Sequence, residues 1–114
     1  MDDLRPGVGD VDEALARHAD RVAALRQAVF ASEAVTDPAL RQAAGLGDPL
    51  PDPWGPYAAK VRDESYRVTD ADVAALEAGG CSEEEIFEVT VAVAMGAALR
   101  RLDAGLRAVR GDRT

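Results

Sequence analysis

The sequence predicts an all-α protein, because apolar residues recur at helical spacing and the resulting segments are separated by capping residues, glycines and prolines. The composition agrees: 47% of the 114 residues are hydrophobic but only 4% are aromatic, so the apolar content is mainly Ala, Val and Leu. Small aliphatic side chains suit closely packed helices. A chain of this size can bury a core without disulfides or metals, and we expect residues 1–114 to form a single helical domain.

Two helices are expected in the N-terminal part, at residues 11–44, after a flexible segment at residues 1–10. Asp10 is positioned to cap the first helix, which extends to about Glu33. Its apolar stripe, which we expect to be buried, consists of Val11, Leu15, Val22, Leu25 and Val29. The second helix starts at about Pro38 and ends at Gly45.

Residues 45–53 are rich in glycine and proline and predict a loop. Three helices then form a core region at residues 54–110, and they span about residues 54–66, 70–78 and 83–110. Thr69 is placed to cap the second of these helices. Ser82, with Glu85 three residues later, forms the capping box of the last one.

The last helix is long and unusually apolar. Twenty-eight residues extend roughly 42 Å, whereas a compact domain of this length is roughly 34 Å across. Between residues 86 and 99 the only charge is Glu88. A helix that is apolar on most sides needs cover, and a chain this small is expected to leave it incomplete unless the helix bends at Gly96. We therefore expect a homo-oligomer that packs through the helix at residues 86–109.

The charge distribution limits the classes of molecule that this protein is expected to bind. A formal net charge of −8 disfavours nucleic acid and anionic membrane surfaces. Residues 100–114 nevertheless carry five arginines against two aspartates, which either suit a helix C-terminus or pair with the acidic body of a second subunit. The polar N-terminus has no apolar segment of the signal-peptide type, and no apolar run reaches membrane-spanning length, so a cytoplasmic location is expected.

Residues 57–109 resemble the alkylhydroperoxidase D / carboxymuconolactone decarboxylase family, the AhpD-like proteins. Three segments carry the resemblance: a capped helix at residues 68–76, a glycine turn into a capped helix at residues 80–88, and a run of small residues at 91–102. The resemblance implies an all-helical, oligomeric fold, in agreement with the burial argument.

The peroxidase members of that family use a C-x-x-C pair, a histidine four residues later and an upstream glutamate as proton relay. One thiol attacks peroxide and the other resolves the sulfenate as a disulfide. Cys81 is the only cysteine of this chain. With Glu88 aligned to the family's glutamate, the two cysteines and the histidine are replaced by Arg100, Asp103 and Arg107. The dithiol cycle cannot close within one subunit, so we expect no such activity.

Glu88 and Cys81 are the candidates for chemistry. A carboxylate in an apolar helix needs a partner, contact with solvent or a raised pKa. A salt bridge, for example to Arg62, and a role in proton transfer are both open for Glu88. Cys81 precedes a helix N-terminus, which lowers the pKa of a thiol, but the glutamates that follow it raise that pKa; it is either reactive or a simple turn residue.

The remaining candidate residues point less strongly to a functional site. With one cysteine and one histidine, His18, the sequence predicts no metal site, and nothing indicates a cofactor. Trp54 and Tyr57 either seal the edge of the core or line a ligand pocket. Residues 73–90 have the spacing of a helix-turn-helix, but the leading face of the second helix would present four glutamates to phosphates.

These observations predict an AhpD-like homo-oligomer with a binding or assembly role and without dithiol peroxidase activity. The first alternative is a decarboxylase-like enzyme in which Glu88, with His18 or Tyr57, transfers protons on a small carboxylic acid. A closed apolar cavity holding Glu88 and an arginine favours the enzyme, whereas a fully paired Glu88 favours a structural role. The second alternative, a helix-turn-helix regulator, is the weakest. The expected partner is a second copy of the chain, with a small-molecule ligand left open.

Overall fold

The computed structural model describes residues 8–111, and every regular element in that range is helical. The five α-helices are α1 (Val8–Arg26), α2 (Pro38–Leu46), α3 (Trp54–Glu64), α4 (Asp70–Ala78) and α5 (Glu83–Val109). A π-helical turn, η1 (Gln27–Ala31), continues α1, and a 3-10 turn, η2 (Ser65–Arg67), continues α3. The predictions of an all-α chain, five helices and a long last helix are confirmed.

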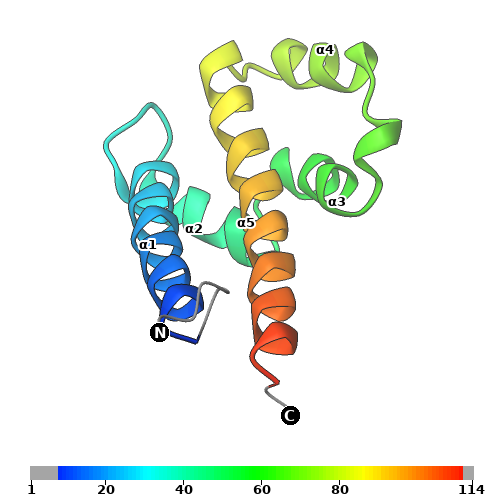
Figure 1. Ribbon diagram of the computed structural model, residues 1–114. Helices are drawn as coiled ribbons and strands as arrows, with labels where there is room; N and C mark the ends of the chain where they lie inside the picture. Colours follow the sequence, from blue (N-terminus) through cyan, green and yellow to red (C-terminus); the bar gives the residue numbers. More distant parts are fainter. Residues whose placement is uncertain (1–7, 112–114) are drawn as a thin grey trace, which may run out of the picture.

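Helix α5 is the central element. Helix α2 and η1 pack on one side of it, and α3 and α4 pack on the other (Figure 1). This part of the molecule, residues 27–99, is called the head. Its core contains residues from α2, α3, α4 and the first half of α5: Ala44, Trp54, Tyr57, Ala58, Val61, Leu76, Ile86, Val89, Ala92 and Val93.

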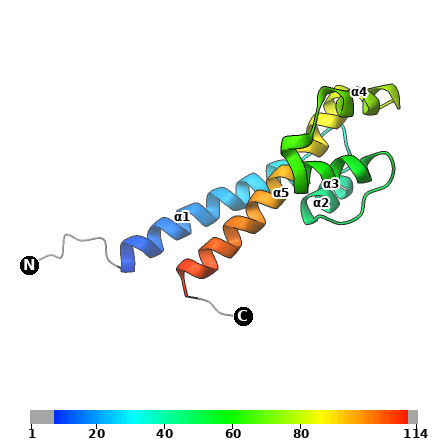
Figure 2. The same cartoon turned by 90° about the vertical axis from the view of Figure 1, so that its right-hand side faces the viewer.

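Two helical segments extend from the head side by side. They are α1 and the end of α5, residues 100–109, and they run antiparallel, so that the start of α1 and the end of α5 lie at the same end of the molecule (Figure 2). We call them the α1 arm and the α5 arm. They make the molecule elongated, with extents of 68 × 28 × 25 Å. The radius of gyration is 18.0 Å, against about 13 Å for a compact domain of this length.

The predicted caps of α4 and α5 are confirmed, and each of them is a reciprocal capping box. The Thr69 side chain accepts a hydrogen bond from the backbone N–H of Asp72, whose carboxylate accepts one from Thr69 in return. Ser82 and Glu85 form the same reciprocal pair at the start of α5. These contacts satisfy backbone donors that the first turn of a helix cannot pair internally. Local sequence therefore set where α4 and α5 begin.

Two glycines have roles that the sequence did not predict. Gly45 does not end α2: it is buried within that helix, which stops two residues later at Gly47, in the left-handed conformation with φ 78°. Helix α5 is continuous through Gly96. Both glycines belong to a helix crossing. A Cβ on Gly96 would overlap the backbone of Gly45, so α2 and α5 approach each other closely because Gly96 has no side chain, and a Cβ on Gly45 would overlap the Phe30 ring.

The predicted N-terminal boundaries need correction. Helix α1 already includes residues 8–10, so Asp10 lies inside the helix and is not its cap, and the predicted flexible segment is wrong for those residues. Residues 1–7 lie outside the described range. The predicted loop at 45–53 is shorter, because α2 extends through Leu46.

The prediction that one chain would not fully cover the first half of α5 is confirmed in part: Phe87, Ala94 and Ala98 are exposed, and Val91 and Met95 are half-buried. Seven residues of α5 are buried by the chain itself: Ile86, Val89, Ala92, Val93, Gly96, Ala97 and Leu99. Helices α2 and α3 supply most of this cover. It is effective because α2 lies directly against the α5 backbone at the glycine crossing, where two helices of ordinary composition would be held farther apart.

The glycine crossing gives a stability prediction. Replacing Gly96 by Ala places a Cβ where the Gly45 backbone lies, and this overlap can be relieved only if α2 moves away from α5. We expect the Gly96→Ala variant to lose about 3 kcal/mol of unfolding free energy in urea denaturation, at the upper end of ordinary overpacking costs.

The matched control lies in the same helix. A Cβ on Gly105 meets no atom within 4 Å, so Gly105→Ala gains about 0.5–1 kcal/mol from helix propensity alone. Equal effects of the two substitutions would contradict the assignment of Gly96 to a backbone crossing.

Candidate functional site

Glu88 lies one to two turns into α5 and faces the segment that joins η1 to α2. Its Oε1 accepts hydrogen bonds from the backbone N–H of Thr36 at 2.8 Å and from the Thr36 hydroxyl at 2.6 Å. Its Oε2 accepts the backbone N–H of Val35 at 3.0 Å. Both carboxylate oxygens are thus used to hold a loop against the helix.

Arg41 holds the same segment from the other side. This arginine of α2 is only 2% exposed. Its guanidinium donates to the backbone carbonyl of Val29 at 2.7 Å and to that of Ser32, two carbonyls near the C-terminal end of η1. A cation bound to the carbonyls at a helix end is stabilised by the helix dipole. Arg41 also attracts the Glu88 carboxylate electrostatically.

The proposed salt bridge from Glu88 to Arg62 is not present in the described structure. Arg62 instead binds Asp63, the next residue of α3, with a guanidinium-to-carboxylate distance of 3.0 Å. The partners of Glu88 come from a loop that is 52 residues away in sequence. No periodicity or spacing argument indicated them.

The environment of Glu88 keeps its carboxyl group ionised. Burial raises its pKa, but the hydrogen bonds from the Thr36 side chain and from the backbone of Thr36 and Val35, together with Arg41, outweigh burial and lower the pKa below the ordinary value. A general acid requires the opposite shift. A paired, ionised Glu88 favours the structural interpretation of this residue over proton transfer.

Cys81 lies in the turn between α4 and α5 and is half-buried. Its backbone N–H donates to the carbonyl of Leu76 at 3.0 Å. Burial raises the pKa of the thiol, and the charge of Glu85 raises it further. Thiolate formation is therefore suppressed, which is the reverse of what a reactive cysteine needs.

The two aromatic candidates belong to the core. Trp54 and Tyr57 are buried in the first two turns of α3. The Tyr57 hydroxyl is 2.7 Å from the Thr90 hydroxyl, which itself donates to the carbonyl of Ile86. This arrangement satisfies a buried polar group at the core edge. Within the described structure, neither Tyr57 nor His18 hydrogen-bonds to Glu88, so the three residues do not form a catalytic group.

A second feature, which the sequence did not indicate, is a groove between the two arms. It encloses about 290 Å³. Its lining comes from both arms: Leu15, His18, Ala19, Val22, Ala23, Arg26, Leu102, Asp103, Leu106 and Arg110. An ion pair between Arg26, the last residue of α1, and Asp103 joins the two arms at 3.1 Å. The Nε2 atom of His18 is buried there and has no hydrogen-bond partner among the described residues.

The apolar faces of the arms are poorly covered. The stripe predicted to be buried in α1 is not: Leu15, Val22 and Val29 are half-buried, and Leu25 is exposed. On the α5 arm, Leu102 and Leu106 are half-buried, and Val109 is 73% exposed. The chain buries one face of α5 in the head but leaves the apolar faces of the arms half covered, since each arm has mainly the other arm as neighbour.

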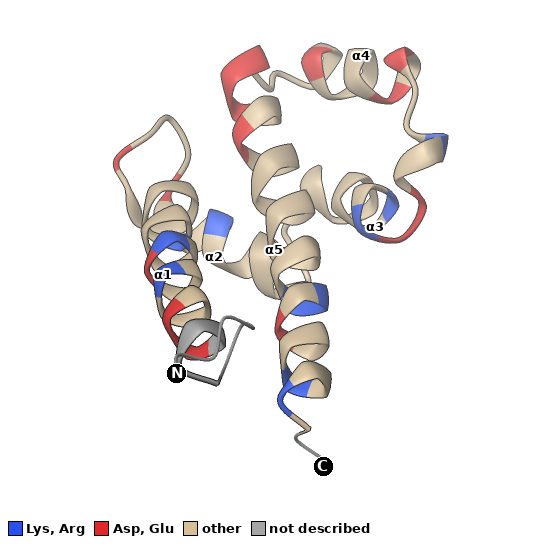
Figure 3. Cartoon of the chain, in the orientation of Figure 1, with Lys and Arg blue, Asp and Glu red and all other residues tan. Residues whose placement is uncertain are grey.

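Charge is also separated along the molecule. Acidic residues gather at both ends of α4 and on the first turns of α5, whereas arginines dominate the α5 arm (Figure 3). Helix α1 carries charges of both signs, with Asp12 and Glu13 in its first half and Arg21 and Arg26 in its second half.

No protein-family model matches the sequence, and neither a curated protein nor a solved structure is significantly similar to it. The resemblance to the AhpD-like family stays a prediction. Over residues 8–111, no helix combines the length and apolar character needed to cross a membrane. The same residues bring together no cluster of histidine, cysteine and carboxylate side chains suited to a metal ion.

The Glu88 contacts predict a stability change that depends on pH. We expect Glu88→Gln to cost about 1–3 kcal/mol of unfolding free energy at pH 7, because an amide cannot accept three hydrogen bonds with both of its polar atoms. The folded pKa is lowered, so the Glu88 contribution is complete above the ordinary value of 4.5 and is lost as the pH falls through the lowered pKa. Urea denaturation across this range measures it.

The control is Glu77→Gln on the exposed surface of α4, which we expect to change stability by less than about 0.5 kcal/mol at any of these pH values. The difference between the wild type and the Glu88 variant should shrink on acidification, while the difference for the Glu77 variant stays small. A Glu88 deficit that is constant down to pH 2 would contradict the ionised clamp.

Proposed function

We propose that this chain is an assembly protein that forms a homo-oligomer through its two arms and has no dithiol peroxidase activity. The observation that carries the proposal is the half-covered apolar face shared by α1 and the α5 arm. An AhpD-like scaffold without its thiol pair, as the sequence suggested, is compatible with such a role. We also propose a cytoplasmic location, because a chain with a single cysteine cannot form an intrachain disulfide.

Hydrophobic burial supports the arms as the contact surface. Leu15, Val22, Leu102 and Leu106 line one continuous groove, and Leu25 and Val109 are exposed beside it or at its end. Two antiparallel helices alone cannot enclose such faces, whereas four helices from two chains form a closed bundle with a shared core. The buried, unpartnered Nε2 of His18 would then lie inside the contact, where a group of the second chain can pair with it.

Charge complementarity favours a second copy as the partner over an unrelated protein. Each copy carries the carboxylates Asp12 and Glu13 on the α1 arm and the arginines Arg100, Arg101 and Arg107 on the α5 arm. Under two-fold rotation the same surface meets itself, so carboxylates of one copy can face arginines of its mate. A surface with charges of one sign only would repel a second copy of itself.

The contacts of Glu88 and Cys81 support a non-catalytic role. Glu88 is ionised and fully hydrogen-bonded to a loop. The pKa of the Cys81 thiol is raised by burial. The lowered pKa of Glu88 makes it a poor general acid, and the raised pKa of Cys81 keeps its thiol protonated at neutral pH, where attack requires a thiolate.

The assembly is tested by its mass in solution. We expect the wild type to have an oligomeric mass at about 10–100 µM in sedimentation equilibrium, and Leu102→Glu/Leu106→Glu to sediment as a monomer, since two carboxylates in an apolar contact face are strongly unfavourable. A Leu15→Glu variant, on the other arm, should also be monomeric.

Ala104→Glu/Ala108→Glu provides the matched control, because both alanines are exposed on the opposite side of the same helix. This variant should keep the wild-type mass. A monomeric wild type at these concentrations, or equal masses for both α5 variants, would contradict assembly through the arms. Circular dichroism confirms that each variant is folded.

A separate prediction concerns peroxide. With a small thiol as donor, we expect no hydroperoxide reduction above the uncatalysed rate, and no difference between the wild type and Cys81→Ser, because one thiol with a raised pKa cannot complete a dithiol cycle. Consumption of peroxide by the wild type that disappears in Cys81→Ser would overturn the non-catalytic proposal.

A further inference from the structure

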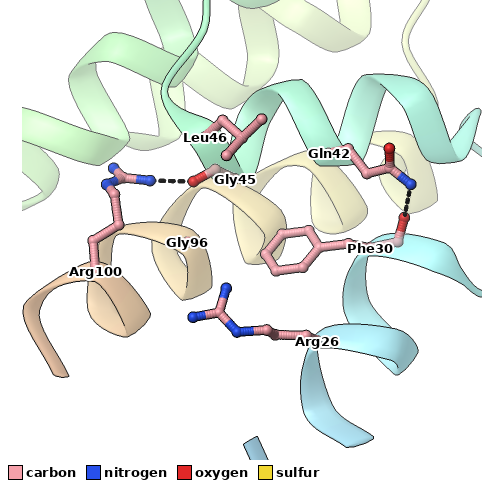
Figure 4. A pocket seen from close by; sticks show the side chains of 7 residues that line it. All are labelled: Arg26, Phe30, Gln42, Gly45, Leu46, Gly96 and Arg100. Carbon is pink, nitrogen blue, oxygen red and sulfur yellow. Dashed lines mark hydrogen bonds between the residues drawn. The ribbon is translucent and has the colours of Figure 1, made fainter. Parts of the chain in front are cut away.

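A cavity of about 230 Å³ lies where α1, α2 and α5 meet, at the junction of the arms and the head. Figure 4 shows the Arg26 side chain and the Phe30 ring extending toward Gly96 of α5, with Leu46 and Gln42 of α2 across the space. It is separate from the Glu88 clamp, since the two have no lining residue in common.

The cavity exists because of the glycine crossing. Gly45 and Gly96 form part of its wall, and a side chain at either position would overlap a neighbour. The Phe30 ring lies so close to Gly45 that a Cβ there would overlap it. Two helix backbones and an aromatic ring therefore give the cavity an apolar wall of fixed shape.

Two guanidinium groups complete the lining. Arg100 donates to the carbonyl of Gly45, and Arg26 pairs with Asp103 at 3.1 Å. Each of these contacts is made by one nitrogen of a group that carries five N–H donors, so both arginines retain donors for another acceptor. Asp103 itself lines the adjacent groove and not this cavity.

The charge of the cavity is opposite to that of the protein. The chain has a formal net charge of −8, but the lining holds two arginines and no carboxylate. Arginine binds planar oxyanions through paired N–H donors. An aromatic ring beside these donors provides a face for a flat apolar group.

We propose that this cavity binds a small organic anion that joins a carboxylate to a flat apolar body. The carboxylate contacts Arg26 and Arg100, and the apolar body packs against Phe30 and Leu46. The volume corresponds to roughly eight water-sized groups, which matches a carboxylate on a single six-membered ring. This site does not depend on the proposed assembly, because its lining comes from one chain.

Benzoate is a suitable probe, with benzyl alcohol as its uncharged analogue and inorganic phosphate as an anion without an apolar body. In NMR titrations of the full chain, we expect saturable benzoate shifts at the amides of Phe30, Gly45 and Gly96. Benzyl alcohol and phosphate should each bind at least about tenfold more weakly, because each lacks one half of the recognition. No saturable benzoate binding at millimolar concentration would overturn the proposal.

Substitutions at two neighbouring arginines distinguish benzoate binding in the cavity from a general attraction of anions to positive charge. Arg100→Gln should raise the benzoate dissociation constant at least about tenfold. The neighbouring Arg101→Gln, which lies outside the cavity and is exposed, should change it less than about twofold. Equal effects of the two variants would overturn the site.

If the Arg100→Gln variant does not fold, the positions of the benzoate-induced NMR shifts in the wild type test the proposed site instead. Shifts confined to the cavity support the site, and shifts spread over the α5 arm, or equal binding of phosphate and benzoate, overturn it.

Discussion

The close crossing of α2 and α5 at Gly45 and Gly96 is the constraint on which the rest of the structure depends. Because Gly96 has no side chain, the Gly45 backbone lies directly against α5, and because Gly45 has none, the Phe30 ring lies directly against α2. The same contact places Arg41 beneath the end of η1 and brings Arg100 to the Gly45 carbonyl. A larger residue at Gly96 would separate α2 from α5, whereas one at Gly45 would displace the Phe30 ring.

The charged residues of the head are used for structure. Glu88 and Arg41 are a carboxylate and a guanidinium in largely apolar surroundings, a combination that often marks a functional site. Here each is bound to backbone groups of the same connection, Glu88 to its N–H groups and Arg41 to its carbonyls. The connection has no regular structure to satisfy its own polar groups, and the two side chains do so instead. Their burial is explained without catalysis.

The head and the arms differ in how much of their apolar surface the chain itself covers. In the head, helices on two sides of α5 bury one face of it, and Val89 and Ala92 are completely inaccessible, although Leu46 and Phe87 remain exposed. In the arms, two helices face each other across a groove and leave leucines half covered. Contiguous apolar surface that a chain leaves open is typical of a surface that binds another protein.

The sequence by itself determined the helical class, the bounds of α4 and the start of α5, because Thr69 and Ser82 cap helices through contacts within four residues. It also determined that Cys81, the one cysteine of the sequence, has no second cysteine in the same chain with which to form a disulfide. It could not determine the roles of Gly45 and Gly96, since a glycine that ends a helix and one that admits a neighbouring helix have the same letter. Only the tertiary structure decided these roles, the loop partners of Glu88 and the cavity between Arg26 and Arg100. All of them join residues more than fifty positions apart, and such pairings follow from packing in space, which local propensity does not encode.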